Sequence, residues 1–334
     1  MKILLLTPVH PLLPKKNPLP QFQTQNYWLI ALKKLKLKTK VFRYTDKIFY
    51  PATKLDRKFP LFSLEFSQRA KIAVNLAEKF KPDYIFYSAG ESGITSLTIK
   101  KLSQIAPVIL FHGTEPNKYA NLEDKKSAPF FNLIVTNDPQ HTKNWLDLGA
   151  RKSICLPFSA VDPKVFKPDK NKKKSIDINF VGSLFPQRQN TLKKLINQAI
   201  NLKIWGWLPP KTKLLQSLKA HYQGEAWGNQ VVNIYQRSKI ALNLVPDHMT
   251  DGGNLRTFEI PATNCLQLID KINPSYYLPN KEIVVFNSPQ DAKKKVDFYL
   301  KFNQKRYLIS KKGYQKTIKN HTFAKRFKKL FNYV

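Results

Sequence analysis

The sequence predicts an α/β protein made of two doubly wound parallel sheets, one in each half of the chain. Short apolar runs of strand length alternate with helical stretches, which is typical of parallel strands joined by crossover helices. A polar, proline-containing stretch interrupts this alternation near the middle of the 334 residues. Because that length is about twice that of a usual single domain, we expect two domains with separate cores.

The first half alternates between strands and helices up to residue 156. The expected strands are residues 2–7, 39–44, 84–88, 108–112, 133–136 and 152–156, and the expected helices are 24–35, 64–80, 93–103 and 139–148. Residues 157–174 then contain three prolines and end in a lysine run, which predicts a domain boundary. We therefore expect an N-terminal domain over residues 1–160 and a C-terminal domain over residues 175–320.

The second half repeats the alternation. The expected strands are residues 177–181, 203–206, 240–245, 265–270 and 283–286, and the expected helices are 189–201, 229–238, 255–263, 290–302, 303–319 and 323–331. In open parallel sheets, ligands bind at the carboxyl ends of the strands, where the strand order reverses. The turns that follow these strands are therefore the places to look for functional residues.

The charge is strongly positive, with 57 Lys+Arg against 22 Asp+Glu and a net charge of +35. With 42% apolar and 12% aromatic residues, the chain is not a disordered polyelectrolyte. Only nine of the basic residues are arginines, and the 48 lysines are spread along the whole length. Because bidentate contacts to bases and phosphates favour arginine, we expect a general affinity for anions and no specific nucleic-acid partner.

Cys155 and Cys265 have no metal-binding spacing and are expected to be buried thiols of a reducing compartment. The apolar run near residue 1 is too short for a secretion signal, and no run reaches the roughly 18 residues of a spanning helix. We expect a cytoplasmic protein, and peripheral contact with an anionic membrane surface stays open. We predict no metal site, because four of the histidines share no metal-ligand spacing. These are His141, His221, His248 and His321.

The segment DGGNLRTFEIPATNC, residues 251–265, is the most informative. Gly252 and Gly253 after Asp251 free the backbone, and Asn254 is a good helix N-cap. The N–H groups at the start of the following helix would then point at the loop, which is how many folds bind a diphosphate. An ordinary capped helix is the alternative.

The helix of this segment carries two charged residues and a proline. Arg256 lies in the first turn, where it can contact an anion bidentately, and Glu259 can accept hydrogen bonds from ribose hydroxyls. Pro261 has no N–H for the carbonyl of Thr257, so the helix should be short or kinked. Surface charges without a function are the alternative.

The segment DINFVGSLFPQRQNTLKKL, residues 177–195, leads from a buried strand into a turn and a helix. Gly182 and Ser183 stand in the turn, where a glycine lets a ligand approach the backbone, and Arg188 stands near the helix start as a second phosphate contact. A plain strand–turn–helix with a surface arginine is the alternative.

In the first half, the strand that ends in FHGTEP places His112 and Glu115 at a carboxyl edge. His112 could take a proton from an acceptor hydroxyl, and Glu115 could act as the base or orient the histidine. A buried histidine of the core is the alternative. Glu91 and His10 follow other strands of this half and are candidates by position alone.

The segments from residue 150 to 331 resemble the CgeB-like (spore-maturation type) glycosyltransferases of the GT-B fold. The resemblance rests on the order of LGARKSICLPFSAVDPKVFKP, FVGSLFPQRQ, LKIWGW, IYQRSKIALNLV, DGGNLRTFEIPATNC, EIVVFNSPQDAKKKVDFYL and GYQKTIKNHTFAKRFKKL. It implies two Rossmann-like domains facing a cleft, with a nucleotide-sugar donor on the C-terminal one. It also implies a glycan, lipid or protein acceptor on the N-terminal domain, no cofactor, and a last helix, residues 321–334, packed back on the N-terminal domain.

The resemblance also implies roles for individual residues. Glu259 would hold the donor ribose, and Asp251 would take the first place of the related E-x7-E pattern, which favours retention of configuration. The other implied donor contacts are Asn254, Arg256, Arg188, Gly182, Ser183, Gly252 and Gly253. Where the family commonly has a glycine after the donor helix, this chain has Asn264, which also tolerates a left-handed backbone.

Two other functions stay open at this point. The same two-domain shape occurs in nucleotide-sugar epimerases, which alter the sugar without an acceptor. A nonenzymatic protein that binds an anionic nucleic acid or membrane surface would also explain the charge.

Overall fold

The computed structural model describes residues 1–7, 20–44, 64–88, 94–247, 249–251 and 253–334, with residues 20–26 and 64–67 as backbone only. The chain divides into two compact units. The N-terminal unit comprises Met1–Phe158, His248–Thr250 and Phe323–Val334, and the C-terminal unit comprises Ser159–Asp247 and Asp251–Thr322. The stretch expected as a linker therefore belongs largely to the C-terminal unit.

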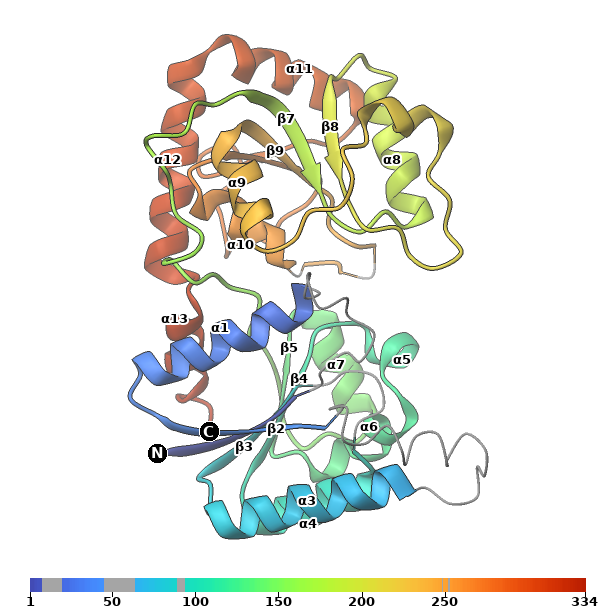
Figure 1. Ribbon diagram of the computed structural model, residues 1–334, viewed down its shortest axis with the longest axis vertical. Coiled ribbons are helices and arrows are strands. Elements are labelled where there is room, and N and C mark those ends of the chain that lie inside the picture. Colours follow the sequence, from blue (N-terminus) through green and yellow to red (C-terminus); the bar gives the residue numbers. More distant parts are fainter. Residues whose placement is uncertain (8–19, 45–63, 89–93, 248, 252) are drawn as a thin grey trace. The chain divides into compact units, whose positions relative to one another are not determined.

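The N-terminal unit holds a parallel sheet of six strands in the order β2-β1-β3-β4-β5-β6 (Figure 1). Its strands are β1 (Lys2–Thr7), β2 (Lys38–Arg43), β3 (Tyr84–Ser88), β4 (Val108–His112), β5 (Leu133–Thr136) and β6 (Ser153–Cys155). Its longer helices are α1 (Pro20–Lys34), α3 (Leu64–Phe80), α4 (Ser96–Ile105), α7 (Pro139–Asp147) and α13 (Phe323–Leu330). The strand order reverses between β1 and β3, as in a doubly wound fold.

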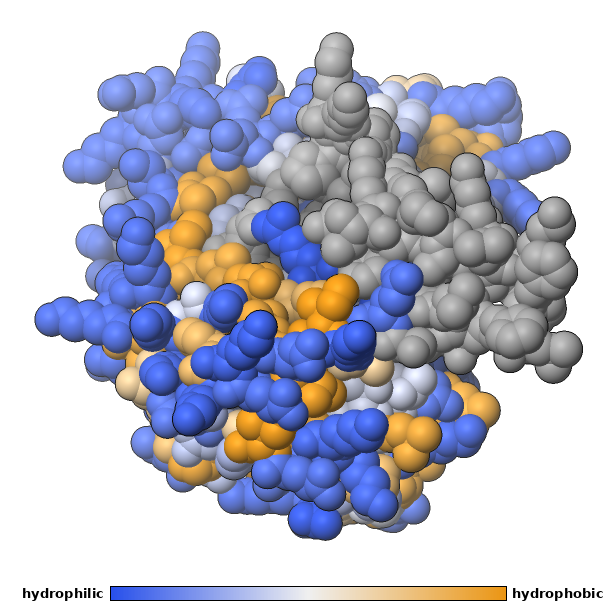
Figure 2. All heavy atoms as spheres, turned by 60° about the horizontal axis from the view of Figure 1, so that its bottom comes forward, coloured by the Kyte–Doolittle hydropathy of each residue, from blue (hydrophilic) through white to orange (hydrophobic). Residues whose placement is uncertain are grey.

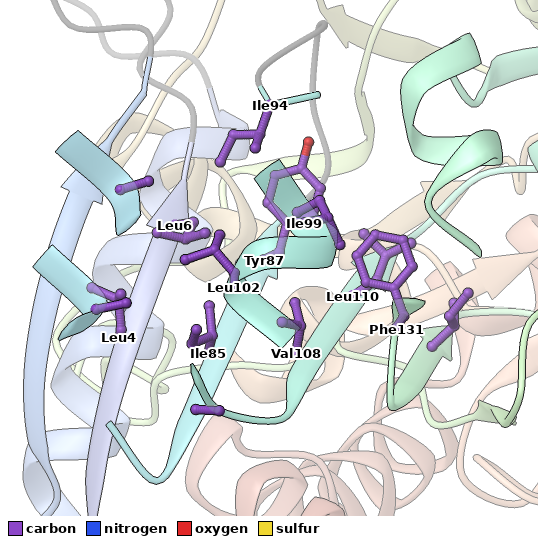
Figure 3. Close-up of a cluster of buried hydrophobic side chains, with 14 of the residues drawn as sticks. Leu4, Leu6, Ile85, Tyr87, Ile94, Ile99, Leu102, Val108, Leu110 and Phe131 are labelled. Atoms are coloured by element: carbon purple, nitrogen blue, oxygen red, sulfur yellow. The ribbon is translucent and has the colours of Figure 1, made fainter. Parts of the chain in front are cut away.

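Alternate residues of the central strands supply two cores, one on each face of this sheet. On the face covered by α3 and α4, aliphatic side chains such as Leu6 and Leu110 flank Tyr87 (Figure 3). On the other face, α1 and α13 bring aromatic rings together. The ring centroid of Trp28 lies 4.7 Å from that of Phe111 and 5.8 Å from that of Phe327. The last helix is thus part of the N-terminal unit.

The C-terminal unit holds a parallel sheet of five strands in the order β11-β10-β9-β7-β8. Its strands are β7 (Ile176–Val181), β8 (Leu202–Trp205), β9 (Ser238–Asn243), β10 (Leu266–Ile269) and β11 (Val284–Val285). Its α-helices are α8 (Pro186–Ile196), α9 (Asn229–Arg237), α10 (Leu255–Ala262), α11 (Pro289–Lys301) and α12 (Asn303–Asn320). The chain leaves β7 first for β8 and later for β9 on the opposite side, so the strand order reverses between β7 and β9.

The structure differs from the expected elements mainly at helix ends and in the loops. Helix α8 starts at Pro186 and ends at Ile196, earlier than expected, because Pro186 suits the first helical position and Ala199 has a left-handed backbone with φ of 56°. Short helices that the sequence pattern did not predict connect β4 to β5, namely α5 (Pro116–Tyr119), α6 (Leu122–Lys126) and the 3₁₀ turn Ala128–Phe130. Asn264 has a φ of 56°, so the left-handed turn expected after the helix of residues 255–263 is confirmed.

Within the residues that the structure describes, no helix combines the length and the apolar character needed to span a bilayer.

Candidate functional site

Arg188 lies at the point where the strand order of the C-terminal unit reverses. Its guanidinium donates one hydrogen bond to the carbonyl of Ser183, just after β7, and another to the carbonyl of Leu244, just after β9, at 2.9 and 3.0 Å. The cation also lies 5.7 Å from the centroid of the Phe180 ring. Arg188 therefore spans the carboxyl ends of β7 and β9, where open parallel sheets bind their ligands.

Arg256 approaches the same strand end from α10. Its Nε donates to the carbonyl of Val181, the last residue of β7, at 3.2 Å, and its Nη1 forms an ion pair with Glu259 one turn further along the helix. The guanidinium lies 5.9 Å from the ring centroid of Tyr235. Both arginines predicted from separate sequence segments thus meet on either side of Gly182.

Charged groups of both signs surround the two arginines at this strand end. Burial lowers the pKa of the Arg188 guanidinium, Asp270 and Asp247 oppose that shift, and the charge of Arg256 adds to it. Glu259 is 6% exposed and Asp251 is exposed to solvent. Arg188 and Arg256 are close enough for their charges to interact, so an anion that contacts both would be attracted by two cations.

Two glycines after β7 and β8 stand in close packing, and at Gly206 the space excludes a Cβ. A Cβ at Gly182 would lie 3.0 Å from the Phe180 ring and 3.5 Å from the Arg188 guanidinium. A Cβ at Gly206, at the end of β8, would lie 2.1 Å from the carbonyl oxygen of Gly182. Gly206 therefore lets the β8 turn support the loop that carries Gly182 and Ser183.

A buried polar network fixes the start of α10. The side chain of Asn254 caps the helix by accepting a hydrogen bond from the Thr257 amide at 3.0 Å, and its amide group donates to Asn243 on β9 at 3.0 Å. Gln267 on β10 donates to the Thr257 carbonyl at 3.3 Å, which is the carbonyl that Pro261 leaves without its helical partner. The proline is thus accommodated in a short helix, and the helix N-terminus is held at the sheet edge.

The other predicted donor residues occupy the same loops. Gly253 is buried, and a Cβ there would lie 3.1 Å from the Phe258 ring, so the backbone turns tightly against α10. Ser183 contributes its carbonyl to Arg188. Gly252 lies outside the described residues. The hydrogen bonds and packing therefore bring Gly182, Ser183, Arg188, Arg256 and Glu259 together, and Asn254 orients the helix that carries two of them.

In the N-terminal unit, His112 ends β4 and is 5% exposed. Burial lowers its pKa to about 4, so the imidazole is neutral near pH 7. Its Nδ1 lies 3.1 Å from the Thr114 carbonyl, which fixes Nδ1 as the protonated nitrogen and Nε2 as an acceptor. The ring meets Trp145 edge-on at 5.2 Å. His112 can accept a proton at Nε2, although its low pKa makes it a weak base.

Glu115 is the N-cap of α5. Its carboxylate accepts hydrogen bonds from the amides of Asn117 and Lys118, at 2.8 and 2.9 Å, and from the side chain of Asn144 at 3.0 Å. Burial raises the pKa of Glu115, but these hydrogen bonds outweigh that effect and leave the pKa below its ordinary value. This geometry gives Glu115 a capping role, and its assignment as a base stays a prediction. Glu91 and His10 lie outside the described residues.

The described part of the chain contains no group of three or more His, Cys, Asp or Glu residues that could hold a metal ion. The positive charge at the end of β7 comes from side chains and from the start of α10.

Residues 187–332 match the family model described as glycosyl transferase-like. Three solved structures are similar over nearly their whole length. A glycosyltransferase from Rickettsia africae has a TM-score of 0.68 at 13% identity, with 99% of this chain and 97% of that one covered. The chain has the GT-B fold.

The sucrose-phosphate synthase from Thermosynechococcus elongatus has a TM-score of 0.67 at 12% identity, covering 99% of this chain and 98% of that one. Anabaena HepE, solved in complex with UDP, has a TM-score of 0.65 at 10% identity and covers 99% of both chains. No curated protein matches the chain in sequence. The predicted fold is confirmed, and so is a glycosyltransferase-like domain in the second half of the GT-B chain.

Three residues of this site were not predicted from the sequence, namely Asn243, Gln267 and Asp270. Asp270 follows β10 and accepts hydrogen bonds from the amides of Val245 and Lys271, both at 3.0 Å, which holds the loop after β9. Asn243 and Asp270 are polar residues at or just beyond the carboxyl end of an apolar strand, whereas Gln267 lies inside β10. That position is the signal that could have identified Asn243 and Asp270.

Proposed function

We propose that the protein is a metal-independent glycosyltransferase that moves a hexose from a nucleoside-diphosphate sugar to an acceptor hydroxyl. The observation that carries the proposal is the pair Arg188 and Arg256 on either side of Gly182, at the strand end where such folds bind ligands. A diphosphate that binds there would be attracted by both guanidinium groups. UDP, which HepE binds, is the first nucleotide to try.

The donor end of the reaction needs stabilisation of a leaving group. The acceptor oxygen forms a bond to the anomeric carbon while the bond from that carbon to the diphosphate oxygen breaks, and the nucleoside diphosphate leaves with the electron pair. Arg188, Arg256 and the amides at the start of α10 stabilise the charge that develops on it. Glu259, one turn along α10, is the residue that we assign to the ribose hydroxyls.

The acceptor end needs a group that takes the hydroxyl proton. We assign that step to Nε2 of His112, which is the unprotonated nitrogen of a neutral imidazole at pH 7. The acceptor class that we propose is a cell-surface glycan, lipid or protein. A CgeB-like subtype accounts best for the order of the motifs, and a location in the cytoplasm accounts best for the reduced thiols.

Turnover with a panel of nucleotide sugars tests this proposal. Purified protein is incubated with each donor, with and without acceptors, and the nucleotide and sugar products are separated. We expect release of nucleoside diphosphate that depends on an acceptor, and loss of that release in Arg256→Ala but not in the exposed Arg237→Ala of α9. Conversion of the sugar on the intact nucleotide would identify an epimerase. No binding of any donor, together with salt-dependent binding of duplex DNA, would identify a nonenzymatic anion-binding protein.

A further inference from the structure

The acidic residues are absent from two long stretches of the sequence. All 22 Asp and Glu residues lie between Asp46 and Asp297. Residues 1–45 carry nine basic side chains, and residues 298–334 carry eleven. About a third of the positive charge therefore lies in stretches that contain no carboxylate side chain.

The fold brings parts of these two stretches together. Helix α1, from the first stretch, lies beside α13, from the second, on one face of the N-terminal sheet (Figure 1). Tyr27 stacks on Phe323 at 5.9 Å, and Trp28 meets Phe327 at 5.8 Å. Trp28 also contacts Phe111 of β4, and Phe327 stacks on Phe86 of β3, so the two helices form one layer on the sheet whose opposite side faces solvent.

The outward side of this layer is basic. On α13 the buried residues Phe323, Phe327 and Leu330 face inward, and Lys328 and Lys329 are exposed. On α1 the corresponding exposed pair is Lys33 and Lys34.

An exposed apolar side chain lies among these lysines. Ile30 is 46% exposed and lies one turn before Lys33 and Lys34 on α1. Figure 2 shows hydrophilic side chains interspersed with smaller apolar areas on the described part of one face of the molecule.

We propose that the outward side of α1 and α13 docks on an anionic lipid bilayer. The lysines supply electrostatic attraction to lipid headgroups, and Ile30 supplies apolar surface that can enter the headgroup region. A nucleic acid is the less suitable partner, because its phosphates and bases are read mainly by arginine and stacking aromatics. The rings of Trp28, Phe323 and Phe327 are buried, and the arginine of α13, Arg326, lines an apolar cavity next to Phe327 and Leu330.

The edge strand β2 adds Lys38 and Lys40 to the same unit, both exposed. Lysines on an edge strand also prevent pairing with other sheets. The proposal therefore rests on the two helices and not on β2.

Vesicle sedimentation tests the proposal with three matched variants. Each variant replaces two adjacent exposed lysines of a helix with alanine: Lys33→Ala/Lys34→Ala on α1, Lys328→Ala/Lys329→Ala on α13, and Lys311→Ala/Lys312→Ala on α12 as the control. The vesicles contain phosphatidylcholine alone or with one third phosphatidylglycerol. The temperature of unfolding of each variant is measured alongside.

We expect the wild type to bind the anionic vesicles and not the neutral ones, with an affinity that falls as salt is added. Each lysine lost from the proposed face should lower the partition coefficient about fivefold, or about 25-fold for a pair, with less than a twofold change in the control. Equal losses in all three variants, or binding that ignores lipid charge, would overturn the proposal. So would variants of α1 and α13 that lose affinity for duplex RNA or DNA but keep their affinity for vesicles.

The outcome of the vesicle assay does not depend on whether the protein transfers a sugar. The vesicle assay needs no donor, so it can succeed in a protein that transfers no sugar and fail in one that does. Arginine variants at the strand end of β7 are expected to bind vesicles as the wild type does.

Discussion

Arg256 and Glu259 form an ion pair across one turn of α10, and the same guanidinium donates to the carbonyl of Val181 at the end of β7. The pair is nearly buried, with side-chain exposures of 18% and 8%. Each partner therefore restrains the other, and the cation is held in place before a ligand arrives. Such preorganisation lowers the cost of binding a charged donor.

Glu259→Gln tests whether the carboxylate contacts the nucleoside part of a donor. The glutamine keeps the size of the side chain but removes the charge and half of its acceptor capacity. We expect the affinity for UDP to fall at least tenfold, whereas the affinity for inorganic diphosphate stays the same or rises, because Arg256 loses its anionic partner. Calorimetric titration with both ligands checks this. An equal fall for the two ligands would show that Glu259 acts only through Arg256.

Gly206→Ala tests the close approach of the two turns beside the site. Its Cβ would lie 2.1 Å from the backbone oxygen of Gly182, so the loop that carries Gly182 has to shift. We expect the free energy of unfolding to fall by about 3 kcal/mol or more, and the affinity for UDP to fall with it.

Gly224→Ala is the matched control. Gly224 has a φ of 89° and no atom within 4 Å of a Cβ, so alanine there meets backbone strain alone. We expect the free energy of unfolding of this variant to fall by about 1 kcal/mol. Urea titration compares the two variants, and equal losses would mean that the backbone around Gly206 relaxes without cost.

The sheets were the most predictable part of the fold. Both were predicted strand by strand. The central strands, such as β1, β4 and β9, are short apolar runs buried on both sides, and the edge strand β2 was predicted from its place in the alternation with helices. The site arginines were predicted because each stands in the turn or first helical turn after a buried strand.

The polar network under α10 was not predicted, since the contacts among Asn243, Gln267 and Thr257 join residues from different strands and a helix. Pro261 illustrates the difference. The sequence shows which carbonyl it leaves without a partner, but only the fold shows that Gln267 supplies the hydrogen bond. The capping role of Glu115 likewise depends on α5, a helix of four residues, PNKY, too short to leave a periodic pattern.

His112→Asn tests both the acceptor assignment and the effect of burial. The folded pKa of about 4 lies below the ordinary 6.5, so between these values the unfolded chain binds a proton that the folded protein does not. The contribution of His112 to stability is therefore present above pH 6.5 and is lost as the pH falls towards 4. We expect the stability of the variant not to show this fall between pH 6.5 and 4. We also expect its turnover to be at least 100-fold lower than that of the wild type.

The pH profile of kcat/KM in the wild type gives a second readout for His112. If the neutral imidazole accepts the proton, activity should stay level between pH 7 and 5 as far as this group is concerned. An acid limb near pH 6.5 would contradict burial of the ring, and unchanged turnover in His112→Asn would remove it from the reaction.

Asp124→Asn tests a titration of opposite sign. Asp124 is 1% exposed, and burial raises its pKa to about 7, although hydrogen bonds from Tyr87 and Asn121 lower it. Between pH 4 and 7 the folded protein keeps a proton that the unfolded chain has lost, so stability falls as the pH rises. The slope should reach up to about 1.4 kcal/mol per pH unit.

In the wild type, the pH dependence that Asp124 contributes opposes the one that His112 contributes. Their summed contribution to the free energy of unfolding therefore changes little between pH 4 and 7. Urea titrations from pH 4 to 7 should therefore show stability that rises with pH in Asp124→Asn and falls with pH in His112→Asn. Parallel curves for the two variants would refute both pKa assignments.

The most direct test of the central claim is the affinity for UDP of a variant that lacks both arginines at the end of β7. Titration calorimetry compares the wild type, Arg188→Ala/Arg256→Ala, and Arg237→Ala, whose arginine is exposed and donates to Ser175 on the surface. We predict binding by the wild type and the control, and a loss of at least 100-fold in the double variant while its unfolding transition stays cooperative. Unchanged affinity in a folded double variant would place the donor elsewhere and contradict the assignment of this site.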